Sequence, residues 1–171
     1  MNIPNILTVI RIILVPIFII TFFSVNKWIA LIIFIIAGIT DFLDGYIARK
    51  YDLITDLGVV LDPFADKLML ISVLVVFTMV NYIPLFILII VVTKELFMIF
   101  FGAKFYFSKN KIVIPANKYG KITTVLFYIS ITIITFNINE IINNVLIFAV
   151  AISTMVAFIS YYKIAKREIK K

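Results

Sequence analysis

The sequence predicts an all-α membrane protein, a single domain over residues 1–171 built from six transmembrane helices. Its composition is 64% hydrophobic and 15% charged, whereas soluble domains average about 45–50% apolar and about 25% charged residues. The mean hydropathy is +1.18. The apolar runs approach the roughly 20 residues that a helix needs to cross a bilayer, and they lack the alternation of a barrel strand. Helices also satisfy their own backbone hydrogen bonds in lipid, which favours them further.

Short polar breaks separate the apolar runs and set the helix boundaries. We expect helices over residues 1–24, 28–50, 57–80, 85–107, 120–136 and 145–162. A polar link at 51–56 joins the second helix to the third, and a basic loop at 108–119 joins the fourth to the fifth. Because the second and third helices are joined by so short a link, we expect them to lie antiparallel to each other.

The basic residues predict the orientation in the membrane. Five lysines lie in residues 104–121 and five basic residues in the tail from Lys163 to Lys171, whereas the loops on the opposite side hold essentially Lys27 alone. The positive-inside rule therefore places both termini, the link and the basic loop in the cytoplasm. The net charge of +7 is explained by this bias and by contact with anionic lipid, so we expect no nucleic-acid partner.

The residue types that are missing restrict the chemistry. The sequence contains no cysteine and no histidine. Disulfides, thiolate metal sites, histidine-ligated zinc and Ser-His-Asp hydrolysis are therefore excluded. A general base in this protein has to be a carboxylate or, less favourably, a Lys or Tyr.

Six of the nine acidic residues lie between Asp41 and Asp66, with apolar sequence on both sides. One face of the second helix carries Asp41, Asp44, Gly45 and Ala48, which are spaced i, i+3, i+4 and i+7. One face of the third carries Gly58, Asp62 and Asp66, spaced i, i+4 and i+8. We expect the two faces to meet, which brings together four side chains, here called the carboxylate cluster: Asp41, Asp44, Asp62 and Asp66.

Four like charges cannot all stay ionised at close range without a cation. One or two hard divalent ions, Mg²⁺ or Mn²⁺, fit this all-oxygen donor set and could clamp a phosphoryl group. Arg49 offers a fork for a phosphate. Two other readings stay open: the small residues could serve helix packing, and the carboxylates could form the path of a cation transporter. The absence of an internal repeat argues against an inverted-repeat transporter.

The first helix carries polar residues at helical spacing, Asn5, Thr8 and Arg11, which we expect to face inward. The alternative is that Asn5 caps the helix and Arg11 reaches the membrane surface.

The motif of the carboxylate cluster resembles the signature of the CDP-alcohol phosphatidyltransferases. Its eight defining positions, which include the glycines, Ala48 and Arg49, are filled at the family spacing, and the start Asn2 to Arg11 is also similar. The resemblance implies transfer of a substituted phosphate from a CDP-linked lipid to an alcohol, with release of CMP. It further implies that Asp41, Asp44 and Asp62 bind metal, and that Asp66 contacts a second metal and deprotonates the acceptor. It implies that the CDP portion is bound by Asn5, Thr8, Gly45, Ala48, Arg49, Thr55 and Gly58.

The acceptor side is similar to bacterial phosphatidylglycerophosphate synthases of this family, which act on glycerol 3-phosphate in the cell membrane. The similar segments are Lys94-Glu95 and Gly120-Lys121-Ile-Thr123-Thr124, where those enzymes usually carry Arg-Glu and Gly-Lys-x-Lys-Thr. The family's cardiolipin synthases also lack the second lysine, and they use phosphatidylglycerol, which is the alternative acceptor. Serine and inositol phosphate are acceptors that we rank below these two. We expect Arg11, Lys94 and Lys121 to bind the acceptor. The resemblance also implies a homodimer.

Overall fold

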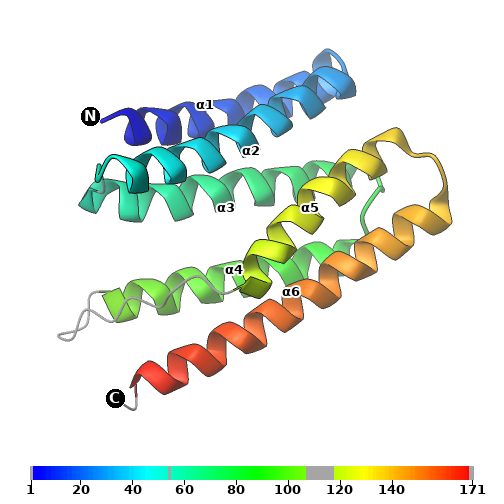
Figure 1. The fold of residues 1–171 in the computed structure, drawn as a ribbon. Helices are drawn as coiled ribbons and strands as arrows, with labels where there is room; N and C mark the ends of the chain where they lie inside the picture. Colours follow the sequence, from blue (N-terminus) through cyan, green and yellow to red (C-terminus); the bar gives the residue numbers. More distant parts are fainter. Residues whose placement is uncertain (1, 54, 107–117, 170–171) are drawn as a thin grey trace. The chain divides into compact units, whose positions relative to one another are not determined.

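The computed structural model describes residues 2–53, 55–106 and 118–169, and every regular element in these ranges is an α-helix (Figure 1). The prediction of an all-α fold is confirmed for this part of the chain. The helices are α1 (Ile3–Ser24), α2 (Lys27–Lys50), α3 (Asp56–Met79), α4 (Leu85–Tyr106), α5 (Lys118–Phe136) and α6 (Glu140–Ile169).

The predicted bounds are close for α1 to α4 and wrong for α6. This helix begins at Glu140 because the side chain of Asn139 accepts a hydrogen bond from the backbone N–H of Ile141 at 2.7 Å, as an N-cap does. Asn143, which we expected in the turn, lies inside the helix and donates to Asn137 Oδ1 at 2.8 Å. The helix also continues to Ile169, well beyond the expected end near Tyr162, since basic residues are favourable near a helix C-terminus.

The fifth helix also begins earlier than predicted, at Lys118 in place of Gly120. Residues 108–117 of the expected basic loop lie outside the described part of the chain.

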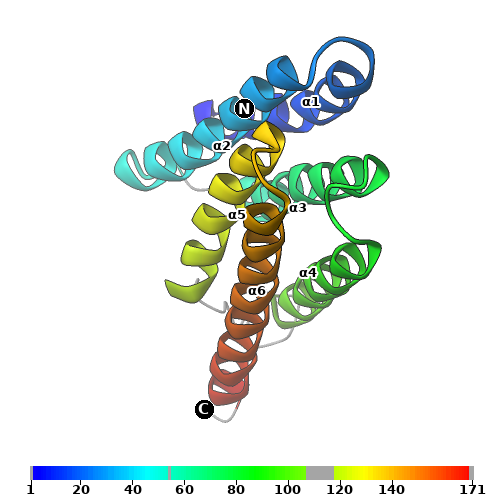
Figure 2. The ribbon, with the colours of Figure 1, turned by 90° about the vertical axis from the view of Figure 1, so that its right-hand side faces the viewer.

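Contacts divide the chain into two compact units, residues 1–81 and 82–171. In the first unit, α1 packs against both α2 and α3, whereas α2 and α3 touch each other over a shorter length. Consecutive helices run antiparallel, so the start of α1, the end of α2 and the start of α3 lie at the same end of this unit (Figures 1 and 2). That end brings the two halves of the acidic motif together.

Aromatic and aliphatic side chains fill the opposite end of the first unit. The rings of Phe18 and Phe34 lie 6.4 Å apart, and those of Phe22 and Phe77 lie 5.7 Å apart. Tilted pairs of this kind add about 0.5–1.5 kcal/mol beyond simple burial. The first unit thus has an apolar core at one end and polar side chains at the other.

In the second unit, α5 and α6 form an antiparallel hairpin and α4 packs against α6. Ile131, Ile134 and Val150 are buried in the hairpin. The hydroxyl of Thr123 donates to the carbonyl of Ser153 at 3.1 Å, which ties α5 to α6.

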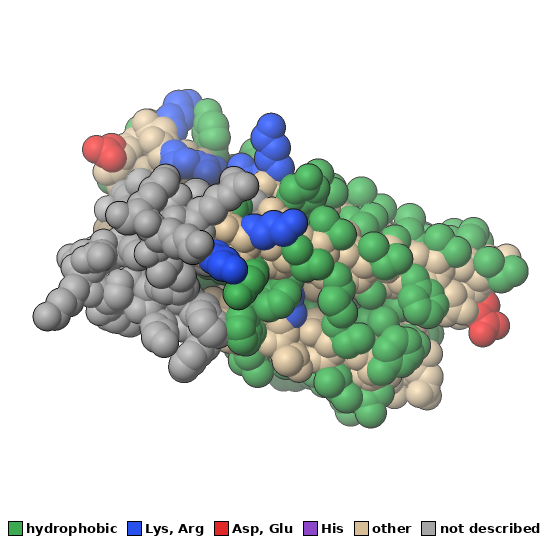
Figure 3. All heavy atoms as spheres, turned by 90° about the horizontal axis from the view of Figure 1, so that it is seen from below, with side chains coloured by type: hydrophobic (Ala, Val, Ile, Leu, Met, Phe, Trp, Pro, Cys, Tyr) green, Lys and Arg blue, Asp and Glu red, His purple; other side chains and the backbone are tan. Residues whose placement is uncertain are grey.

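The outward faces of the helices are apolar. On α1, exposed side chains recur at helical spacing: Ile3, Ile6, Ile10, Ile13, Ile17 and Ile20. On the face shown in Figure 3, hydrophobic side chains cover much of the described surface. Among the described residues, four segments are long and apolar enough to cross a membrane, namely α1, α2, α5 and Glu140–Ile164 of α6. These features are those of an integral membrane protein.

Candidate active site

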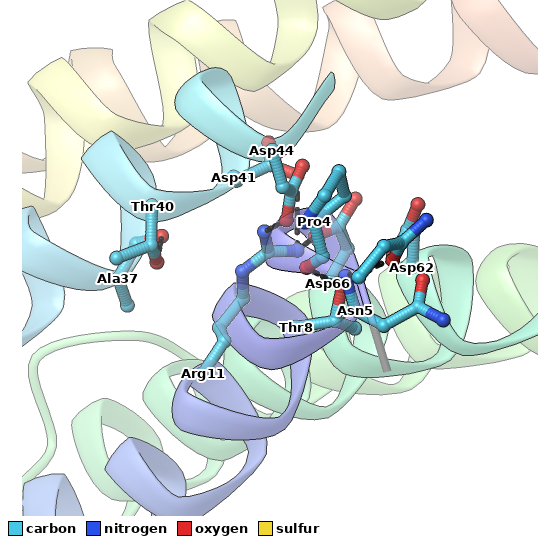
Figure 4. Close-up of polar contacts among 11 residues, drawn as sticks. Pro4, Asn5, Thr8, Arg11, Ala37, Thr40, Asp41, Asp44, Asp62 and Asp66 are labelled. Atoms are coloured by element: carbon cyan, nitrogen blue, oxygen red, sulfur yellow. Dashed lines mark hydrogen bonds and ion pairs between the residues drawn. The ribbon is translucent and has the colours of Figure 1, made fainter. Parts of the chain in front are cut away.

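A row of polar side chains on α1 forms one wall of the site. Asn2, Asn5, Thr8 and Arg11 follow one another at every third residue and are called here the α1 polar stripe. Asn5, Thr8 and Arg11 are only 5%, 0% and 1% exposed. The expectation that they face inward is confirmed, and Figure 4 shows them pointing toward the carboxylates of α2 and α3. The side chain of Arg11 is buried within the unit.

The first half of the stripe holds the link between α2 and α3. Asn2 donates to the carbonyl of Leu53 at 2.6 Å. Thr55 is the N-cap of α3, since its hydroxyl oxygen accepts from the N–H of Gly58 at 3.0 Å. The same hydroxyl donates to Asn5 Oδ1 at 3.2 Å, so the start of α3 is attached to α1.

Thr8 and Arg11 bind the carboxylate cluster directly. The Thr8 hydroxyl lies 2.5 Å from Asp62 Oδ1. The Arg11 guanidinium is 3.0 Å from Asp41 Oδ1 through Nη1, and it also forms ion pairs with Asp44 and Asp66 (Figure 4). All four carboxylates therefore have a partner on α1. The carboxylates of α2 and α3 that pair with Arg11 meet around this one cation.

The carboxylates differ in their access to solvent. The side chain of Asp44 is 3% exposed, whereas those of Asp41 and Asp66 are 34% and 37% exposed. Asp62 is also partly exposed, so three of the four carboxylates are accessible to a substrate. Asp44 is the buried carboxylate of the four.

The donor chemistry of the cluster fits a hard divalent ion, because carboxylate oxygens are the preferred ligands of Mg²⁺ and Mn²⁺. The arrangement seen here is different: within the described residues, no three acidic side chains are disposed to hold a metal ion together. The guanidinium of Arg11 lies among the oxygens instead. The residue types therefore suit a metal, and binding one requires Arg11 and the carboxylates to rearrange.

A cavity of about 160 Å³ opens beside the cluster at the same end of the first unit. It is called here the motif pocket, and all three helices and the link contribute to its wall: Pro4, Asn5, Gly45, Ala48, Arg49, Leu53, Thr55, Gly58 and Asp62. Asp62 belongs to both the pocket and the cluster, so a ligand in the pocket would extend to the carboxylates. The lining combines small residues, hydroxyl and amide groups and one guanidinium, which suits a polar, phosphate-bearing group.

The two motif glycines have different surroundings. A Cβ atom on Gly58 would lie 3.0 Å from Asn5 Oδ1 and 3.1 Å from Thr55 Oγ1, closer than side chains normally tolerate. A Cβ atom on Gly45 would meet only Arg49 Nη2, at an ordinary 3.5 Å. Gly58 is therefore needed for the close contact of α3 with α1, whereas Gly45 leaves space inside the motif pocket.

Within the first unit the structure brings together most of the residues that the sequence predicts, whereas two of them belong to the second unit. The residues expected to hold metal and the CDP portion all lie in the first unit. Lys94 and Lys121 lie in the second unit, on α4 and α5. Lys94 Nζ is 2.5 Å from the buried Glu95 carboxylate, and Lys121 is exposed.

Sequence reasoning missed Asn2, Pro4 and Leu53 as members of the site. Asn2 holds the link, and the other two line the motif pocket. Continuing the spacing of the polar stripe by one step toward the N-terminus would have found Asn2. Leu53 gave no signal, because an apolar residue in a short link is unremarkable.

The comparison with known families shows the family of the chain. Residues 1–159 match the CDP-alcohol phosphatidyltransferase family, and the chain belongs to it. It is an enzyme of this class, a phosphatidyltransferase, as the sequence predicts.

Within this family, the chain is similar to proteins called CDP-diacylglycerol–glycerol-3-phosphate 3-phosphatidyltransferase. The protein of Rickettsia felis is 28% identical over 97% of this chain and 96% of its own length. That of Bacillus subtilis is 35% identical over 72% of this chain and 70% of its own. That of Haemophilus influenzae is 49% identical over a shorter stretch, 43% of this chain and 42% of its own.

Proposed function

We propose that this enzyme transfers the phosphatidyl group of CDP-diacylglycerol to glycerol 3-phosphate, which releases CMP and forms phosphatidylglycerophosphate. The observation that carries the proposal is the carboxylate cluster, which opens into the motif pocket at one end of the first unit. The family membership supports the CDP-linked donor, and the names of the relatives support both substrates.

The motif pocket would bind the CDP portion of the donor. Gly45 and Ala48 leave room beside α2, and Arg49 could pair with a phosphate through its two terminal nitrogens. Asn5 and Thr55 offer an amide and a hydroxyl at the other wall. The two acyl chains would stay in the membrane, which the apolar outer surfaces of the helices imply.

Mg²⁺ or Mn²⁺, held by Asp41, Asp44, Asp62 and Asp66, would supply positive charge beside the phosphates during transfer. Asp66 would accept the proton from the acceptor hydroxyl. The oxygen of that hydroxyl forms a bond to the phosphorus that carries diacylglycerol, and the bond from this phosphorus to CMP breaks. A carboxylate has to act as the base because the chain has no histidine.

The acceptor would be bound by cations. Arg11, Lys94 and Lys121 are the candidates, and a phosphate monoester suits Lys or Arg. Phosphatidylglycerol is the second candidate acceptor, because Thr123 stands where related synthases usually carry lysine and its hydroxyl bonds to Ser153. Cardiolipin would then be the product.

In the membrane, we propose six spans, with both termini and the active site on the cytoplasmic side, and a homodimer as the assembly. The basic tail supports this orientation through the positive-inside rule. The cytoplasm is also where the water-soluble substrate glycerol 3-phosphate would be supplied.

Purified protein with CDP-diacylglycerol and Mg²⁺ tests the proposal. Glycerol 3-phosphate and phosphatidylglycerol are offered in parallel, and CMP and lipids are measured by mass spectrometry. We expect phosphatidylglycerophosphate from the first acceptor, and loss of nearly all CMP release in Asp62→Asn. Cardiolipin from the second acceptor alone would overturn the choice of acceptor. Absence of CMP with either acceptor would overturn the reaction and favour a cation path.

A further inference from the structure

The most unusual contacts in the first unit are the ion pairs of Arg11. Its side chain is 1% exposed, and its guanidinium contacts Asp41, Asp44 and Asp66 from within the unit. The contacts join α1 to both α2 and α3. A bidentate pair with a single carboxylate uses two of the five N–H donors of an arginine, whereas Arg11 contacts three carboxylates.

The charges at this position do not balance. When fully ionised, the four carboxylates carry four negative charges, the guanidinium of Arg11 offsets one of them, and Lys67 acts electrostatically on Asp66 as a second cation. Thr8 gives Asp62 a hydrogen bond and no charge. The cluster therefore keeps an affinity for further positive charge while Arg11 is in place.

A divalent ion and the guanidinium would compete for the same three carboxylates, each of which Arg11 contacts through one oxygen. Arg11 takes Asp41 Oδ1, Asp44 Oδ2 and Asp66 Oδ1, and a metal bound by these aspartates needs oxygens from the same carboxylates. Two cations cannot share them at close range without strong repulsion. The guanidinium must therefore move away from the oxygens that a metal takes.

We propose that Arg11 is a resident counter-ion that exchanges with the metal. It holds the carboxylates of α2 and α3 together when no ion is bound, and it leaves them when a divalent ion enters. This inference rests on the proposed metal site of the transferase. Arg11 acts through the aspartates and is a positioning residue, which makes the metal-free enzyme stable and lowers the apparent affinity for metal.

If Arg11 exchanges with the metal, replacing Arg11 should lower the stability of the metal-free protein and raise its affinity for metal. In Arg11→Met, the metal-free protein should have a lower Tm, because three carboxylates lose their paired cation. Mg²⁺ or Mn²⁺ should bind at least about tenfold more tightly. A residue with a purely structural role would lower both quantities together. Isothermal titration calorimetry and thermal unfolding in detergent, without substrate, measure the two. Arg49→Met is the matched control, since it removes the same charge without contacting the carboxylates in the described contacts, and both quantities should change little.

A second measurement uses the unaltered protein in case Arg11→Met does not fold. The chain has three arginines, Arg11, Arg49 and Arg167, so ¹⁵N-arginine labelling gives a simple NMR spectrum of their side chains. Addition of Mg²⁺ should shift the signals of the Arg11 guanidinium, as its nitrogens are released from ion pairs. Unchanged Arg11 signals at saturating Mg²⁺ would overturn the exchange.

The outcomes separate this inference from the proposed reaction. Equal or weaker metal binding by a folded Arg11→Met would overturn the exchange even if CMP release is normal. Tighter binding by Arg11→Met, together with no CMP release by the wild type, would support the exchange and overturn the transferase reaction. No metal binding by either protein would overturn the exchange.

Discussion

Replacing each motif glycine by alanine separates a packing role from a ligand-binding role. In Gly45→Ala, the new Cβ would meet only Arg49 Nη2 at 3.5 Å, so no neighbour has to move. Alanine is favoured over glycine in a helix interior by about 1 kcal/mol. The free energy of unfolding should therefore stay equal or rise by up to about 1 kcal/mol. That corresponds to a Tm increase of at most about 2–4 °C for a chain of this length.

The same methyl group should impair substrate binding, since Gly45 lines the motif pocket of about 160 Å³. Forcing an extra methyl group into a filled site typically costs about 1–3 kcal/mol. The KM for CDP-diacylglycerol should rise about 5- to 150-fold at that cost. CMP release at varied CDP-diacylglycerol concentration measures the KM, and thermal unfolding in detergent measures the Tm.

Gly58→Ala is the matched comparison and should lose stability. Its Cβ would lie 3.0 Å from Asn5 Oδ1 and 3.1 Å from Thr55 Oγ1, so both side chains have to shift and the hydrogen bond between them is disturbed. We expect a loss of about 1–3 kcal/mol. The reasoning would be refuted by a Gly45→Ala enzyme that is less stable than wild type and keeps its KM, because Gly45 would then serve helix packing.

Two further predictions concern the helix cap and the metal. Thr55→Val removes the N-cap of α3 and should lower the free energy of unfolding by about 0.5–2 kcal/mol. Thr55→Ser keeps the hydroxyl and should retain most of the wild-type stability. Equal Tm values for the two variants would contradict the capping role. Treatment with EDTA should abolish CMP release, and added Mg²⁺ or Mn²⁺ should restore it, because the acidic groups need a divalent counter-charge. Undiminished CMP release after dialysis against EDTA would contradict metal dependence.

The positions of the acidic residues could be predicted from the sequence because their spacing fixes their side of each helix. A period of about 3.6 residues places Asp41 and Asp44 on one face of α2, and Asp62 and Asp66 on one face of α3. The short link then leaves little choice in how α2 and α3 are arranged. Local geometry alone was sufficient for this part of the site.

The side chain that pairs with the carboxylate cluster could not be predicted in the same way. We assigned Arg11 to the acceptor, whereas the structure places its guanidinium among Asp41, Asp44 and Asp66. Which groups a long side chain contacts depends on the packing of α1 between two other helices, and spacing within one helix does not determine that. Its role toward the acceptor stays a prediction.

Helix ends were the least predictable part of the fold. The asparagines of residues 137–144 were interpreted as one polar turn, yet Asn139 caps α6 and Asn143 lies within it. Asn137 has a left-handed backbone with φ of 49°, a conformation that asparagine tolerates and that ends α5. The same residue type therefore ends one helix, starts the next and lies inside it, and only the tertiary contacts separate these roles.

The face of α1 that is buried changes its chemistry along its length, and this change explains where the site lies. Asn5, Thr8 and Arg11 come first, and Val15 and Phe18 follow on the same face. The polar part contacts the link and the carboxylates, whereas Phe18 packs against Phe34 in the apolar core. Burying a charge is costly unless it is paired, so the polar part is stable only where α2 and α3 present their acidic residues. The same set of contacts on α1 therefore holds α2 and α3 in position along α1 and completes the candidate active site.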